Sequence, residues 1–161
     1  MWVFMITCYV LSGLSFLLLT IAFLQNLFNF TVLAAGPLTF ILLTSIFYLF
    51  TETLIIFFFV GTGVSVKEYS LENHLDPQYH RTSIAIKRKV YPPQLLNIFL
   101  MIVLFILFGV VDTGRFPVFY YRVYFLACLV QFLDAKRIQH EAFKDNTHNI
   151  LAMAGIAPGT R

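Results

Sequence analysis

Four long apolar stretches constrain this chain more than any other feature. They cover about residues 3–24, 38–64, 95–111 and 118–133. An α-helix rises about 1.5 Å per residue, so each stretch, with its flanks, is long enough to cross about 30 Å of hydrocarbon. Inside lipid the backbone polar groups find no water, and a helix satisfies them within its own segment. The sequence therefore predicts an all-α, polytopic membrane protein with four transmembrane helices.

The composition supports the membrane class. Of the 161 residues, 59% are hydrophobic and only 12% are charged, whereas a soluble domain carries about 25% charged residues. We expect residues 1–161 to form a single membrane domain. The first stretch is longer than a signal-peptide core and no basic residue precedes it, so we expect a retained span. Cys8 and Cys128 both lie inside apolar stretches and indicate no disulfide framework.

Positive charge is distributed unequally between the connections. Nine of the 11 basic residues lie in the segment 65–93 or after residue 133, and only Arg115 and Arg122 lie on the other side. Because basic residues favour the cytoplasmic side of a membrane, this bias predicts cytoplasmic termini and a cytoplasmic loop at 65–93. We expect the bacterial inner membrane as the location.

Two further helical segments are expected outside the apolar stretches. The residues 71–77 favour a short helix that stops before Pro77. After the fourth stretch, no proline or glycine interrupts the chain before Gly155. This predicts a cytoplasmic helical extension of the fourth span over residues 134–154, ended by Gly155.

Glu52 lies near the middle of the second apolar stretch. A charged side chain at this depth costs roughly 2.5–3.5 kcal/mol on insertion scales, so it is a candidate functional residue. Three interpretations are open. Glu52 is protonated and bonded to Tyr48, Ser12, Ser15 or a partner subunit; it relays protons or cations; or it forms an ion pair with Arg122.

Small and polar residues mark further candidate contacts. Gly61 and Gly63 lack the strand and third glycine of a dinucleotide fingerprint, so close packing of a helix, lipid or quinone headgroup is the better interpretation. Gln94 and Asn97 are placed to bond a neighbouring helix. The small residues of the first stretch that we expect at helix contacts are Ser12, Gly13 and Ser15.

The remaining polar residues indicate no catalytic chemistry. Lys87, Arg88 and Lys89 precede the third span and are predicted to anchor it by contacting anionic lipid headgroups. All four histidines lie outside the apolar stretches, so the chain offers no axial ligand for a transmembrane haem. We expect no metal site and no cofactor other than a bound lipid or quinone.

These observations favour a non-catalytic integral membrane subunit that packs against a larger complex, with respiratory, photosynthetic or ion-translocating complexes as examples. One alternative is a homo-oligomeric proton or cation channel, or a proton-coupled carrier, that uses Glu52. A weaker alternative is a quinone- or lipid-binding membrane anchor. The expected partners are the bilayer and other membrane subunits or copies of the chain. The net charge of +3 does not suggest nucleic acid.

Overall fold

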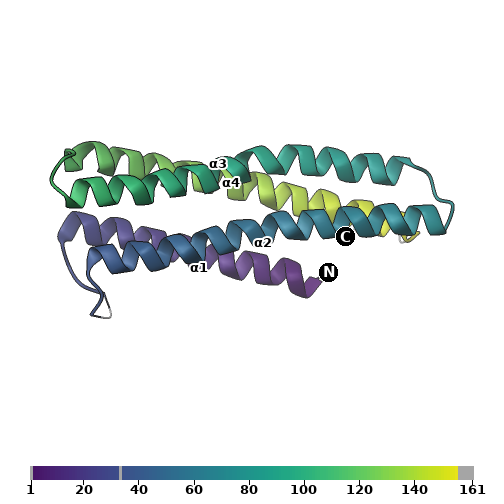
Figure 1. Ribbon diagram of the computed structural model, residues 1–161. Coiled ribbons are helices and arrows are strands. Elements are labelled where there is room, and N and C mark those ends of the chain that lie inside the picture. Colours follow the sequence, from purple (N-terminus) through teal and green to yellow (C-terminus); the bar gives the residue numbers. More distant parts are fainter. Residues whose placement is uncertain (1, 33, 156–161) are drawn as a thin grey trace.

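Four antiparallel helices make up the fold (Figure 1). The structure, a computed structural model, describes residues 2–32 and 34–155. The helices are α1 (Trp2–Phe28), α2 (Pro37–Glu72), α3 (Gln78–Asp112) and α4 (Val118–Met153). Each is long and apolar enough to cross a membrane. The predicted all-α architecture with four such helices is therefore confirmed.

The helix ends follow from local chemistry. Pro37 is the first residue of α2, where its missing N–H would have no intrahelical partner in any case. The Asp76 carboxylate accepts a 2.8 Å hydrogen bond from the backbone N–H of Gln78 at the start of α3. Gly155 follows α4 with φ +71°, a left-handed conformation that glycine adopts without steric cost. As predicted, α4 is one unbroken helix that ends next to Gly155.

The segment 65–93 is not a loop. The helix α2 continues to Glu72 and α3 begins at Gln78, so only residues 73–77 are non-helical. The short helix expected at 71–77 is absent, because these residues form the last turn of α2 and the connection that follows it. Pro92 and Pro93 lie inside α3, although each lacks an N–H for the helix ladder. Packing against α2 and α4 holds α3 continuous through them.

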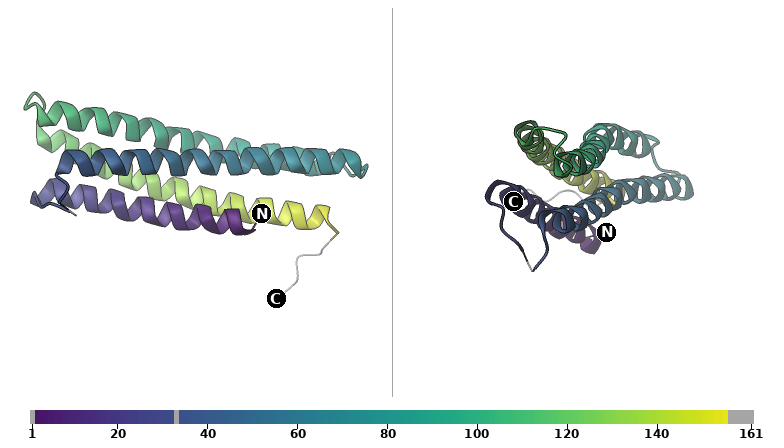
Figure 2. Two further views of the ribbon diagram at one scale, coloured as in Figure 1. Left: turned by 60° about the horizontal axis from the view of Figure 1, so that its bottom comes forward. Right: turned by 60° about the vertical axis from the view of Figure 1, so that its left-hand side comes forward.

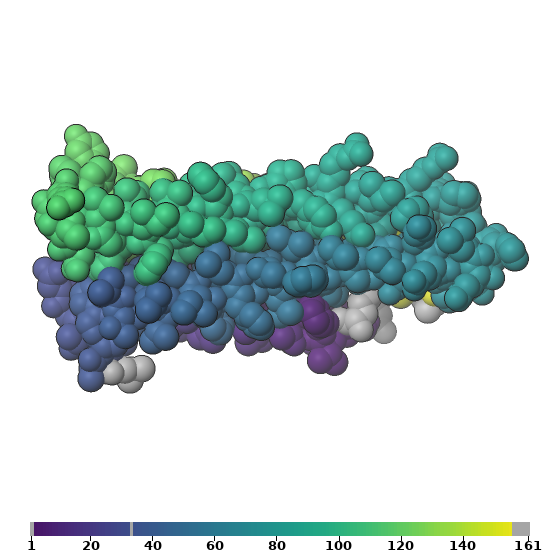
Figure 3. All heavy atoms as spheres, viewed as in Figure 1, coloured from purple at the N-terminus to yellow at the C-terminus, as the bar shows by residue number. Residues whose placement is uncertain are grey.

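Each helix packs mainly against two neighbours, so the four helices form a closed bundle. α1 lies against α2 and α4, and α3 lies against the same two helices. We call the two ends of the bundle after their connections: the α2–α3 end contains residues 73–77, and the α3–α4 end contains residues 113–117. Figures 1 and 2 show that α1 begins well short of the α2–α3 end. At that end only α2, α3 and α4 continue, and α2 with α3 form most of the face seen in Figure 3.

Two hydrophobic clusters fill the bundle. The larger cluster lies toward the α3–α4 end and includes Phe40, Leu104 and Phe125. The smaller lies toward the α2–α3 end and includes Phe59 and Phe143, whose rings stack with centroids 5.2 Å apart. The helical stretches that join the two clusters carry the polar residues from which the candidate site is built.

Candidate functional site

A layer of polar side chains separates the two hydrophobic clusters. All four helices contribute to it, and almost every member is buried. On α3 and α4 the layer follows one helical face, with residues three apart. We call this set the polar layer, and its members are Ser12, Ser15, Thr51, Glu52, Gln94, Asn97, Lys136 and Gln139.

An ion pair lies at the centre of the polar layer. Lys136 Nζ on α4 is 2.6 Å from Glu52 Oε1 on α2, and the side chains are 15% and 0% exposed. The partner of Glu52 within the chain is therefore Lys136, which none of the three interpretations named. Lys136 lies one turn beyond the apolar stretch of α4. Because α2 and α4 begin at the same end of the bundle (Figure 1), that turn reaches the level of Glu52.

The lysine makes two further contacts within α4. Its ammonium group donates a 2.9 Å hydrogen bond to Gln139 Oε1 and lies 4.8 Å from the centre of the Phe132 ring. The amide of Gln94 donates to the same Gln139 oxygen at 3.1 Å. A continuous polar chain therefore runs from α3 through α4 to Glu52 on α2. On the other side of the layer, Ser15 Oγ of α1 donates to Thr51 Oγ1 at 3.1 Å.

The polar layer has unused hydrogen-bonding capacity. Among the described residues, the Ser12 hydroxyl finds no hydrogen-bond partner. The Glu52 carboxylate has two polar neighbours, the Lys136 ammonium group and the Asn97 side chain. Loss of either charge would leave the other buried without compensation, which is strongly destabilising. Transfer of one proton from Lys136 to Glu52 would instead leave two neutral groups. The arrangement therefore suits either a structural ion pair or a site that binds and releases a proton.

Neither Tyr48 nor Arg122 contacts the Glu52 carboxylate as the sequence suggested. Tyr48 is buried one turn before Glu52, but its ring packs on Phe132 with centroids 5.4 Å apart, and no hydrogen bond joins it to the carboxylate. Arg122 lies near the α3–α4 end, where its guanidinium donates to the Asn26 side chain at 3.2 Å and to the Asn26 carbonyl at 2.9 Å. The predicted Glu52–Arg122 pair is wrong because the two residues lie at different levels of the bundle.

The small residues separate into packed and open positions. Ser12 and Ser15 are buried, whereas Gly13 is exposed with no atom near the position of a Cβ; Gly13 is therefore not a helix contact in this bundle. Gly63 makes room for the Lys87 side chain, which crosses α2 and donates a 3.4 Å hydrogen bond to the Val60 carbonyl. Gly61, half a turn away, faces open space.

The three consecutive basic residues have different surroundings in the bundle. Successive side chains on a helix point about 100° apart, and here they have different partners. Lys87 contacts α2, whereas Lys89 forms a 2.9 Å ion pair with Glu141 of α4. Only Arg88 is exposed without an ion pair to a described residue. The contact with anionic lipid that we expect from this cluster would depend mainly on Arg88.

Similarity to known proteins does not assign the site. No protein-family model, curated protein or solved structure matches this chain. The function must therefore be argued from the side chains and the surface of the bundle.

Sequence reasoning missed two members of the polar layer, Lys136 and Gln139. Both lie in the segment 134–154, which the sequence predicts to be a cytoplasmic extension because it follows the apolar stretch. One signal was available: Lys136 lies one turn after Phe132, and Gln139 one turn after Lys136, on the face of α4 that also carries Phe125 and Cys128. Continuation of this inward face past residue 133 indicates that the packed bundle continues there too.

Proposed function

We propose that this chain is an integral membrane subunit whose α1–α2 side packs against an unlike, apolar subunit of a larger membrane complex. The buried ion pair holds α2 and α4 together within the chain. The basic residues orient the α2–α3 end toward the cytoplasm. The observation that carries the proposal is a difference in apolar length between the two sides of the bundle.

The apolar surface of α2 is longer than that of α4. From Pro37 to Val66, α2 has one charged residue, the buried Glu52, over about 44 Å of helix. α4 begins at the same end of the bundle (Figure 1) and reaches Asp134 after about 24 Å. A bilayer has about 30 Å of hydrocarbon. The apolar length of α2 exceeds this thickness and that of α4 falls short of it, so the two helices do not fit one flat membrane equally well.

Side chains at one height along the bundle illustrate the difference in apolar length between α2 and α4. Phe59 of α2 stacks on Phe143 of α4. The next residues along the two helices, Val60 and Lys144, are both exposed. An apolar and a charged surface therefore lie at the same height on different sides of the bundle. α1 extends the apolar side, because Val3 and Ile6 are exposed beyond the level at which Tyr9 bonds His140.

An apolar partner would resolve this conflict. It would cover the excess apolar surface of α1 and α2, while the charged surface of α3 and α4 remains in water. Exposed apolar patches of this kind commonly mark interaction sites. A homo-oligomeric channel lined by Glu52 is less well supported, because the carboxylate is fully buried inside its own bundle and does not face a neighbouring copy.

Site-specific photo-crosslinking in native membranes tests the proposal. A photoreactive residue at Val64 lies on the part of α2 that extends beyond the apolar length of α4. One at Leu126 lies within the apolar length of α4. Both positions are exposed. We expect Val64 to give an adduct with a second, unlike polypeptide and Leu126 to give lipid adducts. Native mass spectrometry in mild detergent would then identify that partner in fixed ratio. Lipid adducts alone at Val64, or an adduct with a second copy of this chain, would overturn the proposal.

The unpaired atoms of the polar layer favour a second candidate, a proton-linked role for Glu52 within one bundle. Proton flux into proteoliposomes that contain a pH-sensitive dye would test it. Flux that is present in the native chain and lost in the folded double variant Glu52→Gln with Lys136→Met, which leaves no buried charge unpaired, would support this role. Equal flux in both chains, or none above that of empty vesicles, would reject it.

A further inference from the structure

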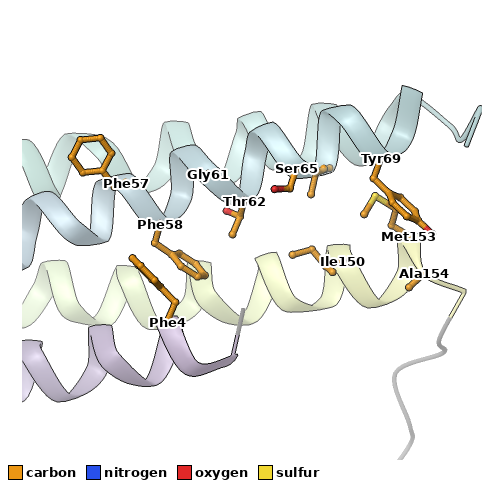
Figure 4. Close-up of a pocket in the computed structure, with 11 residues that line it drawn as sticks. Phe4, Phe57, Phe58, Gly61, Thr62, Ser65, Tyr69, Ile150, Met153 and Ala154 are labelled. Carbon is orange, nitrogen blue, oxygen red and sulfur yellow. The ribbon is translucent and has the colours of Figure 1, made fainter. Parts of the chain in front are cut away.

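We infer that a groove between α2 and α4 binds the chain of an amphiphile with an uncharged, hydrogen-bonding head, such as a neutral glycerolipid or a quinone. The groove has a volume of about 600 Å³ and lies mostly beyond the N-terminal end of α1, from which Phe4 contributes to the lining. Figure 4 shows α2 along one side, α4 along the other, and Phe4 of α1 at one end. The lining comes from α2, α4 and Phe4 of a single chain, so the inference can be tested on the purified chain without a partner.

The end of the groove nearer the bundle centre is closed by aromatic rings. Phe4 stacks on Phe58 with centroids 5.6 Å apart, whereas Phe57 also lines the groove but points away from these two rings (Figure 4). Gly61 follows one turn further along α2, and a Cβ there would meet no atom within 4 Å. The bare backbone of Gly61 therefore widens the groove where an alkyl chain would pass from the rings toward the α2–α3 end.

The lining changes in polarity along α2. Thr62, Ser65 and Tyr69 follow Gly61 toward the α2–α3 end. The Ser65 and Tyr69 hydroxyls form no hydrogen bond with any residue in the described part of the chain, so both remain available to a ligand. The opposite wall, at Ile150 and Met153 of α4, is apolar (Figure 4). This lining contains no charged side chain, which favours an uncharged head.

The volume and position of the groove favour a small amphiphile. Small-molecule sites commonly occupy about 300–1,000 Å³. The groove runs from Phe57 to Tyr69, across the expected end of the second span at Val64. An amphiphile would place its chain on the membrane side of that boundary and its head beside the two free hydroxyls.

A photoreactive monoacylglycerol with a diazirine in its acyl chain provides the test. The purified full-length chain is labelled in detergent, and the modified peptides are mapped by mass spectrometry. We expect labelling to concentrate on residues 57–69 and 150–153. Excess unlabelled monoolein and excess decylubiquinone, added separately, distinguish a glycerolipid site from a quinone site by which of them competes.

Gly61→Leu should reduce labelling of the groove about tenfold, which equals the affinity lost when about two methylene groups no longer reach it. Gly109→Leu is the matched control, because Gly109 lies on α3 and also faces open space; it should leave labelling unchanged. Thermal melting of both variants checks that each is folded. Ser65→Ala combined with Tyr69→Phe should weaken competition by the preferred head while the chain still binds. Equal labelling of Gly61→Leu and the native chain, or labels spread evenly over exposed α3 and α4, would overturn the inference.

Discussion

Glu52 and Lys136 form a 2.6 Å ion pair between two helices that run from the same end of the bundle. The pair lies between two hydrophobic clusters, with α1 and α3 supplying polar neighbours. It fixes the rotation of α2 and α4 about their axes, because only one face of each helix brings the charges together. A buried ion pair of this kind favours one arrangement of helices over others without necessarily adding to stability.

The first prediction concerns the two charges of this pair. Glu52→Gln and Lys136→Met should each destabilise the bundle by about 3–5 kcal/mol, because each leaves an uncompensated buried charge. The double variant should recover most of that loss, since it removes both desolvated charges. Unfolding in detergent, followed by circular dichroism, measures all three. Lys144→Met, an exposed lysine on the same helix, is the control and should change little. Additive losses in the double variant would show that the two residues do not interact.

The second prediction separates the two glycines of α2. Ala has a higher helix propensity than Gly by about 1 kcal/mol, and Gly61→Ala should gain up to this amount because the site is open. Gly63→Ala should gain less, because its methyl group displaces Lys87 from the Val60 carbonyl. The lost hydrogen bond is worth about 0.5–1.5 kcal/mol.

A Lys87→Ala background provides the control for this pair of variants. There the effects of the two alanine substitutions on the unfolding free energy should approach each other, since the long side chain is gone and only the Ser83 hydroxyl remains close to a Cβ at Gly63. An undiminished difference in this background would mean that Gly63 does not serve to make room for Lys87.

The third prediction concerns pH at the charged part of α3 and α4. A hydrogen bond from Lys89 holds the pKa of Glu141 below its ordinary value of 4.5, and the same bond to Glu141 raises the pKa of Lys89. Because the folded-state pKa of Glu141 is the lower one, its contribution to stability is complete above about pH 4.5 and is lost as pH falls through the folded value. The Lys89 contribution is complete at neutral pH and is lost only in strong base, above its raised pKa.

Melting temperatures between pH 7 and pH 3 test this sign. The native chain should lose an increment of stability below about pH 4.5 that Glu141→Gln and Lys89→Met both lack. Both side chains are about half exposed, so the increment should be small and should shrink in high salt. An identical acid profile for native chain and variants would contradict the prediction.

The fourth prediction concerns the packing of α1. Ser15 is fully buried and bonds Thr51, so Ser15→Leu should overpack the α1–α2 contact and cost about 1–3 kcal/mol. Gly13→Leu places the same side chain two residues away at an open position and should be close to neutral. Protection of α1 from hydrogen exchange in detergent would report the difference directly. If Gly13→Leu is the more damaging change, the rotation of α1 in the bundle is wrong.

The sequence by itself determined that the chain forms four long apolar helices and that α4 continues without a break until it ends next to Gly155. Those features depend on the local composition of single segments: apolar length, charge, and the residues that start or stop a helix. The loop expected at 65–93 was wrong for a related reason. Charged residues and two prolines made the segment resemble a loop, whereas contacts with α2 and α4 keep α3 helical through Pro92 and Pro93.

Only the tertiary structure decided the partners of the buried polar residues. Glu52 was identifiable as a costly buried acid from its place in an apolar stretch, but Lys136 lies 84 residues later, outside the apolar part of α4. The pairing depends on how far each helix runs before it turns and on how the helices rotate against one another. Both are set by side-chain packing among distant segments, which hydropathy along one segment does not encode.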